Sequence, residues 1–144
     1  EELFKVPVLS CIIRHLGAIP VSREDEVRAG VVLRTLLDIL SMGEDILIFP
    51  EGSRSFDGKL QPLEGGVAML ALHSKAPVLP VYIKGTFEAM PRGCSFPKPK
   101  KIEVVFGTLI DPLDLPNDMK DKQKRYDILD RLEKQFKEMM LELG

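Results

Sequence analysis

Residues 45–55 read DILIFPEGSRS, an apolar run that passes directly into a polar loop. The continuous apolar part, residues 45–50, predicts a central strand that is buried on both faces. In the sheets of α/β proteins, ligands bind beyond the carboxyl ends of the strands. The loop that begins at Glu51 is therefore the place where we expect the functional residues.

Helical and strand-like segments alternate along the rest of the chain. This alternation predicts an α/β fold, with a mixed or mostly parallel central sheet flanked by helices in a single domain. We expect helices over residues 6–16, 24–42, 63–75 and 119–143, and further strands over residues 17–21, 77–83 and 102–106. The last helix is amphipathic, and its apolar face comprises Leu129, Leu132, Phe136, Met139, Met140 and Leu143.

The composition argues against several classes of protein. The 144 residues suffice for one domain with a core, and a net charge of −2 gives no reason to expect a nucleic-acid partner. Cys11 and Cys94 have neither metal-site spacing nor a disulfide framework, so we expect free thiols and no metal. No apolar run reaches the roughly 18 residues of a membrane-spanning helix. Because the chain opens on Glu1 rather than on Met, we expect a piece of a longer protein.

The loop after Pro50 combines side chains that suit an anion. Arg54 offers a planar guanidinium fork that fits a phosphate. Glu51, three residues earlier, offers a carboxylate that can accept a bond from a hydroxyl or hold the arginine. Gly52 lets the chain bend freely between them. The alternative is an ordinary turn with a local ion pair between Glu51 and Arg54.

Arg23 also follows a predicted strand, residues 17–21. If that strand and residues 45–50 run parallel, their carboxyl ends share one edge of the sheet, and the predicted helix between them suits the crossover. We then expect Arg23, Glu51 and Arg54 to line one pocket, where the surplus positive charge attracts a phosphate. Otherwise Arg23 is a solvated surface residue.

Three short blocks of the sequence stand out: GAIPVSR at residues 17–23, FPEGSRS at residues 49–55 and VLPV at residues 78–81. Their order and spacing resemble those of the 1-acyl-glycerol-3-phosphate acyltransferase family. The first block resembles that family's Gly…Asp-Arg pattern, with Ser22 in the place of Asp. The second resembles its FPEGTRS block, with Ser53 where Thr is usual, and the third resembles the block that ends in Pro-Val.

The resemblance, which covers residues 1 to about 110, implies roles for individual residues. Arg23 and Arg54 are the implied phosphate ligands of the acyl acceptor. The implied wall of the acceptor pocket comprises Glu51, Gly52 and Ser53.

The same resemblance implies a catalytic block, His-x4-Asp, in which the histidine acts as general base on the acceptor hydroxyl. His15 and His73 have Pro20 and Val78 five residues later, so neither fits. We therefore expect no catalytic residue in this chain, and interpret residues 1–144 as the C-terminal portion of an acyltransferase domain that lacks the upstream block. A nucleophilic serine is disfavoured, because no Gly-x-Ser-x-Gly elbow is present.

The implied function is transfer of an acyl chain from acyl-CoA or acyl-carrier protein to 1-acyl-glycerol 3-phosphate, giving phosphatidic acid in phospholipid synthesis. No cofactor is implied beyond this acyl donor, which is a co-substrate. Two alternatives stay open. One is a non-catalytic module that binds phospholipid or phosphate, and the other is an acyltransferase for glycerol 3-phosphate or another lysophospholipid.

A lysophospholipid carries an apolar tail, so the resemblance also implies a membrane surface as partner and a location on its cytoplasmic face. One candidate for the contact is the apolar segment of residues 6–16, for which the alternative is a buried core helix. The other is a basic segment, for which the alternative is a solvated connection. This segment comprises Arg92, Phe96, Lys98, Lys100 and Lys101.

Overall fold

The computed structural model describes residues 15, 17, 26–91, 93, 94 and 96–143. Internal contacts divide the chain into two units, Glu1–Glu44 and Asp45–Gly144. Apart from His15 and Gly17, the predicted helix 6–16 and strand 17–21 lie outside the described residues. Within the described part, no helix combines the length and the apolar character needed to cross a bilayer.

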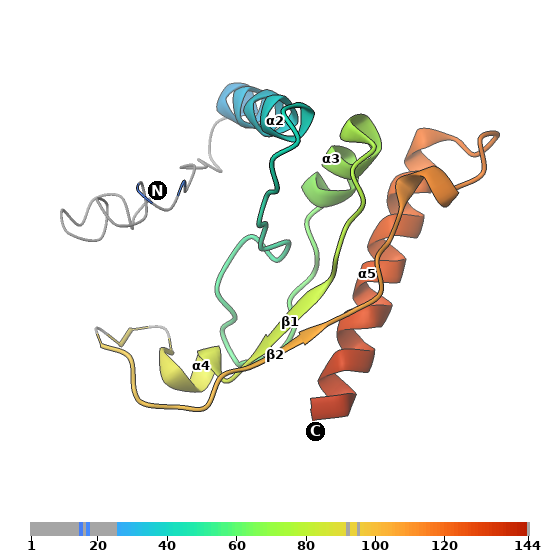
Figure 1. Ribbon diagram of the computed structural model, residues 1–144. Coiled ribbons are helices and arrows are strands. Elements are labelled where there is room, and N and C mark those ends of the chain that lie inside the picture. The colour runs from blue at the N-terminus through green and yellow to red at the C-terminus, as the bar shows by residue number, and fades with distance from the viewer. Residues whose placement is uncertain (1–14, 16, 18–25, 92, 95, 144) are drawn as a thin grey trace. The chain divides into compact units, whose positions relative to one another are not determined.

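The first unit contains helix α2 (Glu26–Ser41), which confirms the helix predicted over residues 24–42 to within two residues at its start and one at its end (Figure 1). The helix ends where Gly43 takes a φ of 81°. Its backbone N–H donates to the Leu40 carbonyl at 3.1 Å. Glycine is favoured there, because other residues resist a left-handed backbone at the end of a helix.

The second unit is built on helix α5 (Asp121–Leu143), which corresponds to the helix predicted over residues 119–143. Its buried residues recur at three- and four-residue steps, and they are Ile128, Leu132, Phe136 and Met139. They form one core with Val67, Ala68 and Ala71 of helix α3 (Gly66–Ser74) and with Ile110 and Leu115. The helical period was predicted correctly. Near the start of the apolar face, however, the fully buried residue is Ile128, and the predicted Leu129 packs only at the edge of the core.

One small sheet lies against this core (Figure 1). Strand β1 (Val81–Lys84) pairs antiparallel with β2 (Glu103–Phe106), in a register that places Val81 opposite Phe106. The pairing continues in an antiparallel bridge between Val78 and Ile110. The strands predicted over 77–83 and 102–106 are thus confirmed within a few residues. The helical turn α4 (Thr86–Ala89) follows β1, and the 3-10 turn η2 (Pro112–Asp114) precedes α5.

The mixed or mostly parallel central sheet that we expected is not confirmed. The sheet formed by the described residues has two strands, which pair antiparallel. Residues 45–50 were predicted to be a strand buried on both faces, but they form no strand, and Leu47 and Phe49 are 76% and 67% exposed. An apolar run becomes a strand only where a neighbour offers hydrogen bonds along its length, and composition does not specify that neighbour. The α/β class, helices packed on a sheet, is confirmed.

The amide of Gln135 joins α5 to the chain just beyond β2. Its Oε1 accepts the backbone N–H of Thr108 at 2.7 Å, and its Nε2 donates to the Thr108 carbonyl at 2.9 Å. A Cβ at the preceding Gly107 would collide with Gln135 Oε1. The close approach fixes the end of β2 against the middle of α5.

We predict that Gly85→Ala lowers the free energy of unfolding by about 2 kcal/mol or more. Gly85 has a φ of 94°, and a Cβ there would collide with the carbonyl oxygen of Lys101. The matched control is Gly66→Ala, because a Cβ at Gly66, at the start of α3, meets nothing within 4 Å. Denaturant unfolding followed by circular dichroism measures both variants. Equal stabilities for the two variants would contradict this account of the turn between β1 and α4.

Candidate functional site

The polar loop predicted from the sequence is closed at its base by two hydrogen bonds. We name it the 50–64 loop, after its first and last residues, Pro50 and Glu64. The backbone N–H of Glu64 donates to the Pro50 carbonyl at 2.7 Å. Within the loop closed by this bond, the backbone N–H of Gln61 donates to Oε2 of Glu51 at 2.8 Å. A hydrogen bond to a carboxylate is stronger than one between neutral groups, so Glu51 holds the two ends of the loop together.

A tight turn opens the loop. The backbone N–H of Gly52 donates to the Phe49 carbonyl at 3.0 Å, and Gly52 takes a φ of 64°. This conformation is strained for residues with a Cβ, which confirms that a glycine lets the chain bend between Glu51 and Arg54.

The far end of the loop is ordered by its own polar groups. The hydroxyl of Ser55 donates to the Lys59 carbonyl at 2.9 Å, and the backbone N–H of Lys59 donates to Asp57 Oδ1 at 3.1 Å. A Cβ at Gly58 would lie 3.1 Å from the ring of Phe87, so this turn rests against α4. The loop is therefore supported at both ends.

The structure brings four of the five predicted site residues together in this loop. Glu51, Gly52 and Ser53 are partly buried, whereas Arg54 is exposed. The Arg54 side chain is thus accessible to solvent. Arg23 lies outside the described residues, so its place in a shared pocket with Glu51 and Arg54 stays a prediction.

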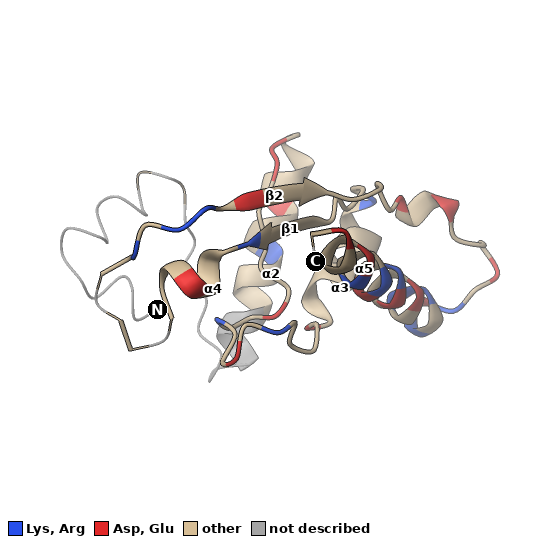
Figure 2. Cartoon of the chain, turned by 90° about the horizontal axis from the view of Figure 1, so that it is seen from below, with Lys and Arg blue, Asp and Glu red and all other residues tan. Residues whose placement is uncertain are grey.

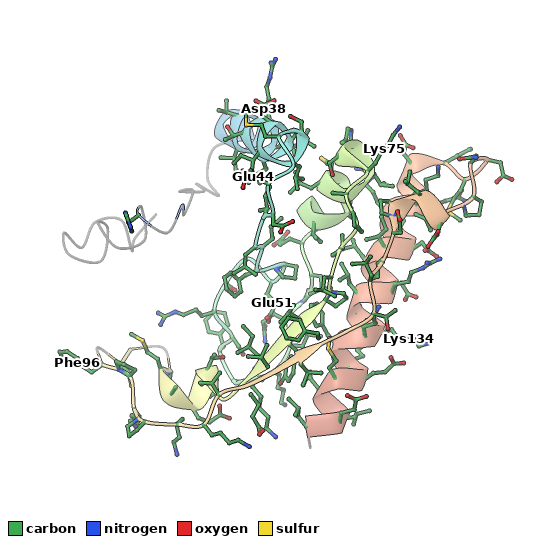
Figure 3. All side chains as sticks on the ribbon, viewed as in Figure 1. Asp38, Glu44, Glu51, Lys75, Phe96 and Lys134 are labelled. Atoms are coloured by element: carbon green, nitrogen blue, oxygen red, sulfur yellow. The ribbon has the colours of Figure 1, made fainter. Side chains whose placement is uncertain are left out.

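Tyr82 is a residue of this region that the sequence analysis missed. It lies on β1, is partly buried against the core, and has a pKa raised above its usual value. Burial is the main cause, followed by the negative charges of Glu88 and Glu51. Glu51 therefore lies close enough to β1 to act on the phenol, and Figure 3 shows it where the loop passes the strand. The signal in the sequence was a lone hydroxyl in an apolar strand, since a buried tyrosine hydroxyl needs a polar neighbour.

Neither described histidine occupies the 50–64 loop. His15 is exposed. His73 is exposed on α3, where its Nδ1–H donates to the Met69 carbonyl of the preceding turn at 2.8 Å. This bond holds the His73 ring against the surface of its own helix.

Comparison with known proteins identifies the family of this chain. A family model described as Acyltransferase matches residues 1–84, which is more than half of the 144 residues. The chain belongs to the Acyltransferase family. The resemblance seen in the three sequence blocks is thereby confirmed.

Members of this family with similar sequences are called 1-acyl-sn-glycerol-3-phosphate acyltransferases. The chloroplastic protein of Brassica napus is 32% identical over 91 residues, which cover 63% of this chain and 26% of the relative. The protein of Bacillus subtilis is 25% identical over 139 residues, which cover 96% of this chain and 65% of the relative. The chain thus spans about a quarter of the length of the plant protein and about two thirds of the bacterial one.

A solved structure of an acyltransferase shares the fold. The crystal structure of the 1-acyl-sn-glycerophosphate acyltransferase PlsC from Thermotoga maritima matches with a TM-score of 0.65 and 29% identity. The match covers 91% of this chain and 52% of the Thermotoga chain. The expectation of an acyltransferase-like fold is therefore confirmed.

We predict that Glu51→Gln and Glu88→Gln each lower the pKa of Tyr82, because each removes a negative charge that opposes tyrosinate formation. The effect of Glu88→Gln is expected to be the larger. Glutamine at position 51 keeps an oxygen that can accept the Gln61 N–H. Ultraviolet titration of tyrosinate in a Tyr126→Phe background isolates Tyr82, since the chain has two tyrosines.

The control for this titration is Asp118→Asn, which removes a charge that does not contribute to the shift at Tyr82. An unchanged Tyr82 titration in Glu51→Gln would show that the Glu51 carboxylate lies away from β1.

Proposed function

We propose that this chain forms the acceptor-binding part of an enzyme that makes phosphatidic acid in phospholipid synthesis. The enzyme would transfer an acyl chain from acyl-CoA or acyl-carrier protein to the free hydroxyl of 1-acyl-glycerol 3-phosphate. Membership of the Acyltransferase family and the names of the similar proteins support this reaction. The observation that carries the proposal is the closed 50–64 loop, which presents an exposed Arg54 after the Glu-Gly-Ser turn.

Arg54 is the residue that we assign to the acceptor phosphate. Its planar guanidinium can donate two parallel hydrogen bonds to phosphate oxygens, a geometry that a lysine ammonium cannot match. The closed loop limits the conformations available to the backbone at Arg54, so less entropy is lost when the phosphate binds. Glu51, Gly52 and Ser53 would shape the adjoining wall, and Arg23 would add a second charge from outside the described residues.

In the proposed reaction, the hydroxyl oxygen of the acceptor forms an ester bond with the acyl carbon of the donor thioester. The carbon–sulfur bond breaks, and the hydroxyl proton ends on the thiol that leaves. The residues described here would bind and orient the acceptor for this step. The general base belongs to a His-x4-Asp block, and neither histidine of the 144 residues has an aspartate five positions later.

The location that we propose is the cytoplasmic face of a membrane. The acceptor carries a long apolar tail and resides in a bilayer, whereas acyl-CoA and acyl-carrier protein are water-soluble donors. The enzyme must therefore work where the two phases meet. No cofactor is required by this chemistry, since the thioester donor is already activated.

A second candidate stays open, a non-catalytic module that binds phospholipid or phosphate. Neither His15 nor His73 has the His-x4-Asp spacing, so the 144 residues by themselves do not distinguish this module from the enzyme. Such a module would use the 50–64 loop for the same phosphate contact without transferring an acyl chain. An acyltransferase specific for glycerol 3-phosphate or another lysophospholipid would also use this contact.

We predict that Arg54→Ala in the full-length protein raises the apparent KM for lysophosphatidate about 10- to 100-fold, which corresponds to the loss of charge-assisted hydrogen bonds. Arg54→Lys should recover only part of this loss, because lysine lacks the fork. The control is Lys59→Ala, which removes an exposed cation from the same loop. Acyl transfer measured over a range of lysophosphatidate concentrations gives the apparent KM of each variant. A normal KM in both Arg54 variants would overturn the assignment of this residue.

We further predict that the purified 144-residue chain does not transfer acyl groups by itself. An assay with labelled acyl-CoA and lysophosphatidate tests this, and the full-length protein serves as the positive control. Transfer by the 144-residue chain that is lost in His15→Ala or in His73→Ala would show that the base lies within this chain. Binding without transfer in the full-length protein as well would favour the non-catalytic module.

A further inference from the structure

An exposed aromatic ring lies in the segment between α4 and β2, close in the sequence to several basic residues. It belongs to a segment that we name the 90–102 loop, which runs from Met90 to Ile102. Phe96 is 82% exposed and lies at the outer end of this loop (Figure 3). Met90 and Ile102 at the two ends of the loop are also exposed. Phe96 is the most exposed of the three, and the charges of the loop around it decide what it can contact.

The base of the 90–102 loop is tied down, so Phe96 is held away from the core. The backbone N–H of Lys98 donates to the Ala89 carbonyl at the end of α4 at 2.7 Å. The carbonyl of Lys101 lies so close to Gly85 that no Cβ fits there. Pro99, between these two contacts, and Pro97, just before the first, further restrict the chain because their rings fix φ.

The charge of this segment has one sign. From Ala89 to Ile102 the sequence contains no Asp or Glu, and Lys98, Lys100 and Lys101 are all exposed. Figure 2 shows this run of basic residues leading into β2, where the first acidic residue follows.

That first acidic residue is Glu103, and its carboxylate lies 2.8 Å from the ammonium of Lys101. The hydrogen bond and the charge of Lys101 lower the pKa of Glu103, so the two residues form an ion pair. Lys98 and Lys100 then supply the net positive charge of the described part of the loop.

We propose that the 90–102 loop docks on a bilayer that contains anionic phospholipids. Phe96 lies at the depth of the headgroups, and Lys98 and Lys100 lie against the phosphates. Lysines on a convex loop suit a diffuse anionic surface, since they act as mobile point charges and need no shaped pocket. An aromatic ring suits the boundary between water and acyl chains. The proposal rests on the proposed function for its membrane setting, and it names the segment that makes the contact.

The chain contains no tryptophan, so Phe96→Trp introduces a single fluorescent reporter at the proposed contact. The 144-residue chain carrying this change is mixed with vesicles of phosphatidylcholine alone or of phosphatidylcholine with phosphatidylglycerol. We expect a blue shift of the emission, and quenching by brominated lipids, with the anionic vesicles. Leu141→Trp is the matched control, because Leu141 is 81% exposed at the end of α5, and its emission should not change.

The charge contribution is tested by vesicle co-sedimentation of Lys98→Gln/Lys100→Gln. A basic residue near an anionic surface contributes about fivefold in affinity, so the double variant should bind about 25-fold more weakly. Lys120→Gln/Lys134→Gln removes the same charge from exposed positions outside the loop and should bind as the unchanged chain does. Added salt should weaken the binding of the unchanged chain. It should also narrow the difference in affinity between the unchanged chain and Lys98→Gln/Lys100→Gln.

Equal losses in the two lysine variants would overturn the proposal, because the attraction would then depend on total charge alone. No response of the Phe96→Trp emission to either vesicle would also overturn it. A response to an acidic polypeptide such as polyglutamate, but not to vesicles, would assign this surface to a protein partner instead. None of these readouts involves acyl transfer, so their failure leaves the proposed function to be decided by the Arg54 variants.

Discussion

The burial of one face of α5 is the interaction on which the second unit of the structure depends. Ile128, Leu132, Phe136 and Met139 are each no more than 7% exposed, although most of the other residues of this helix are polar. The sheet beside the helix has only two strands of four residues each, and such a pair is at best marginally stable alone in water. The contact with α5 therefore stabilises the sheet. The two hydrogen bonds between the Gln135 amide and the Thr108 backbone set the position of the sheet along the helix.

The 50–64 loop, which contains the candidate site, is held in place by this core. Helix α3 packs on α5 through Val67, Ala68 and Ala71, and the 50–64 loop leads directly into the first turn of α3. The bond between Glu64 and Pro50 then fixes the start of the loop relative to its end. In the proposed function, an arginine on a loop held in this way would meet the phosphate with a backbone that is already in place. This is the physical reason to link a helix-packing core to the proposed recognition of the acyl acceptor.

The sequence predicted those features that depend on local pattern. The helical period identified α2 and α5, the helix predicted over residues 63–75 corresponds to α3, and the apolar runs around Val81 and Val105 identified the two strands. The loop residues from Glu51 to Arg54 were found because a polar turn follows an apolar run, and because the block resembles a known family.

Features that depend on which segments meet could not be predicted in this way. Residues 45–50 have the composition of a buried strand, but their burial depends on a neighbour that composition does not name. The antiparallel direction of β1 and β2 follows from the return of the chain through the 90–102 loop, and no single segment encodes it. The bond from Gln61 to Glu51 spans ten residues, and the influence of Glu51 on Tyr82 spans thirty-one. Contacts of this kind emerge only when the chain is folded.

The most direct test of the central claim is a crystal structure of the full-length protein with lysophosphatidate bound. The measured quantity is the distance from the guanidinium nitrogens of Arg54 to the phosphate oxygens of the ligand. Our account predicts paired contacts of about 3 Å, with the 50–64 loop still closed between Glu51 and Gln61. A phosphate bound to other residues, with Arg54 more than about 8 Å away, is too far for any charge-assisted hydrogen bond and would contradict the account.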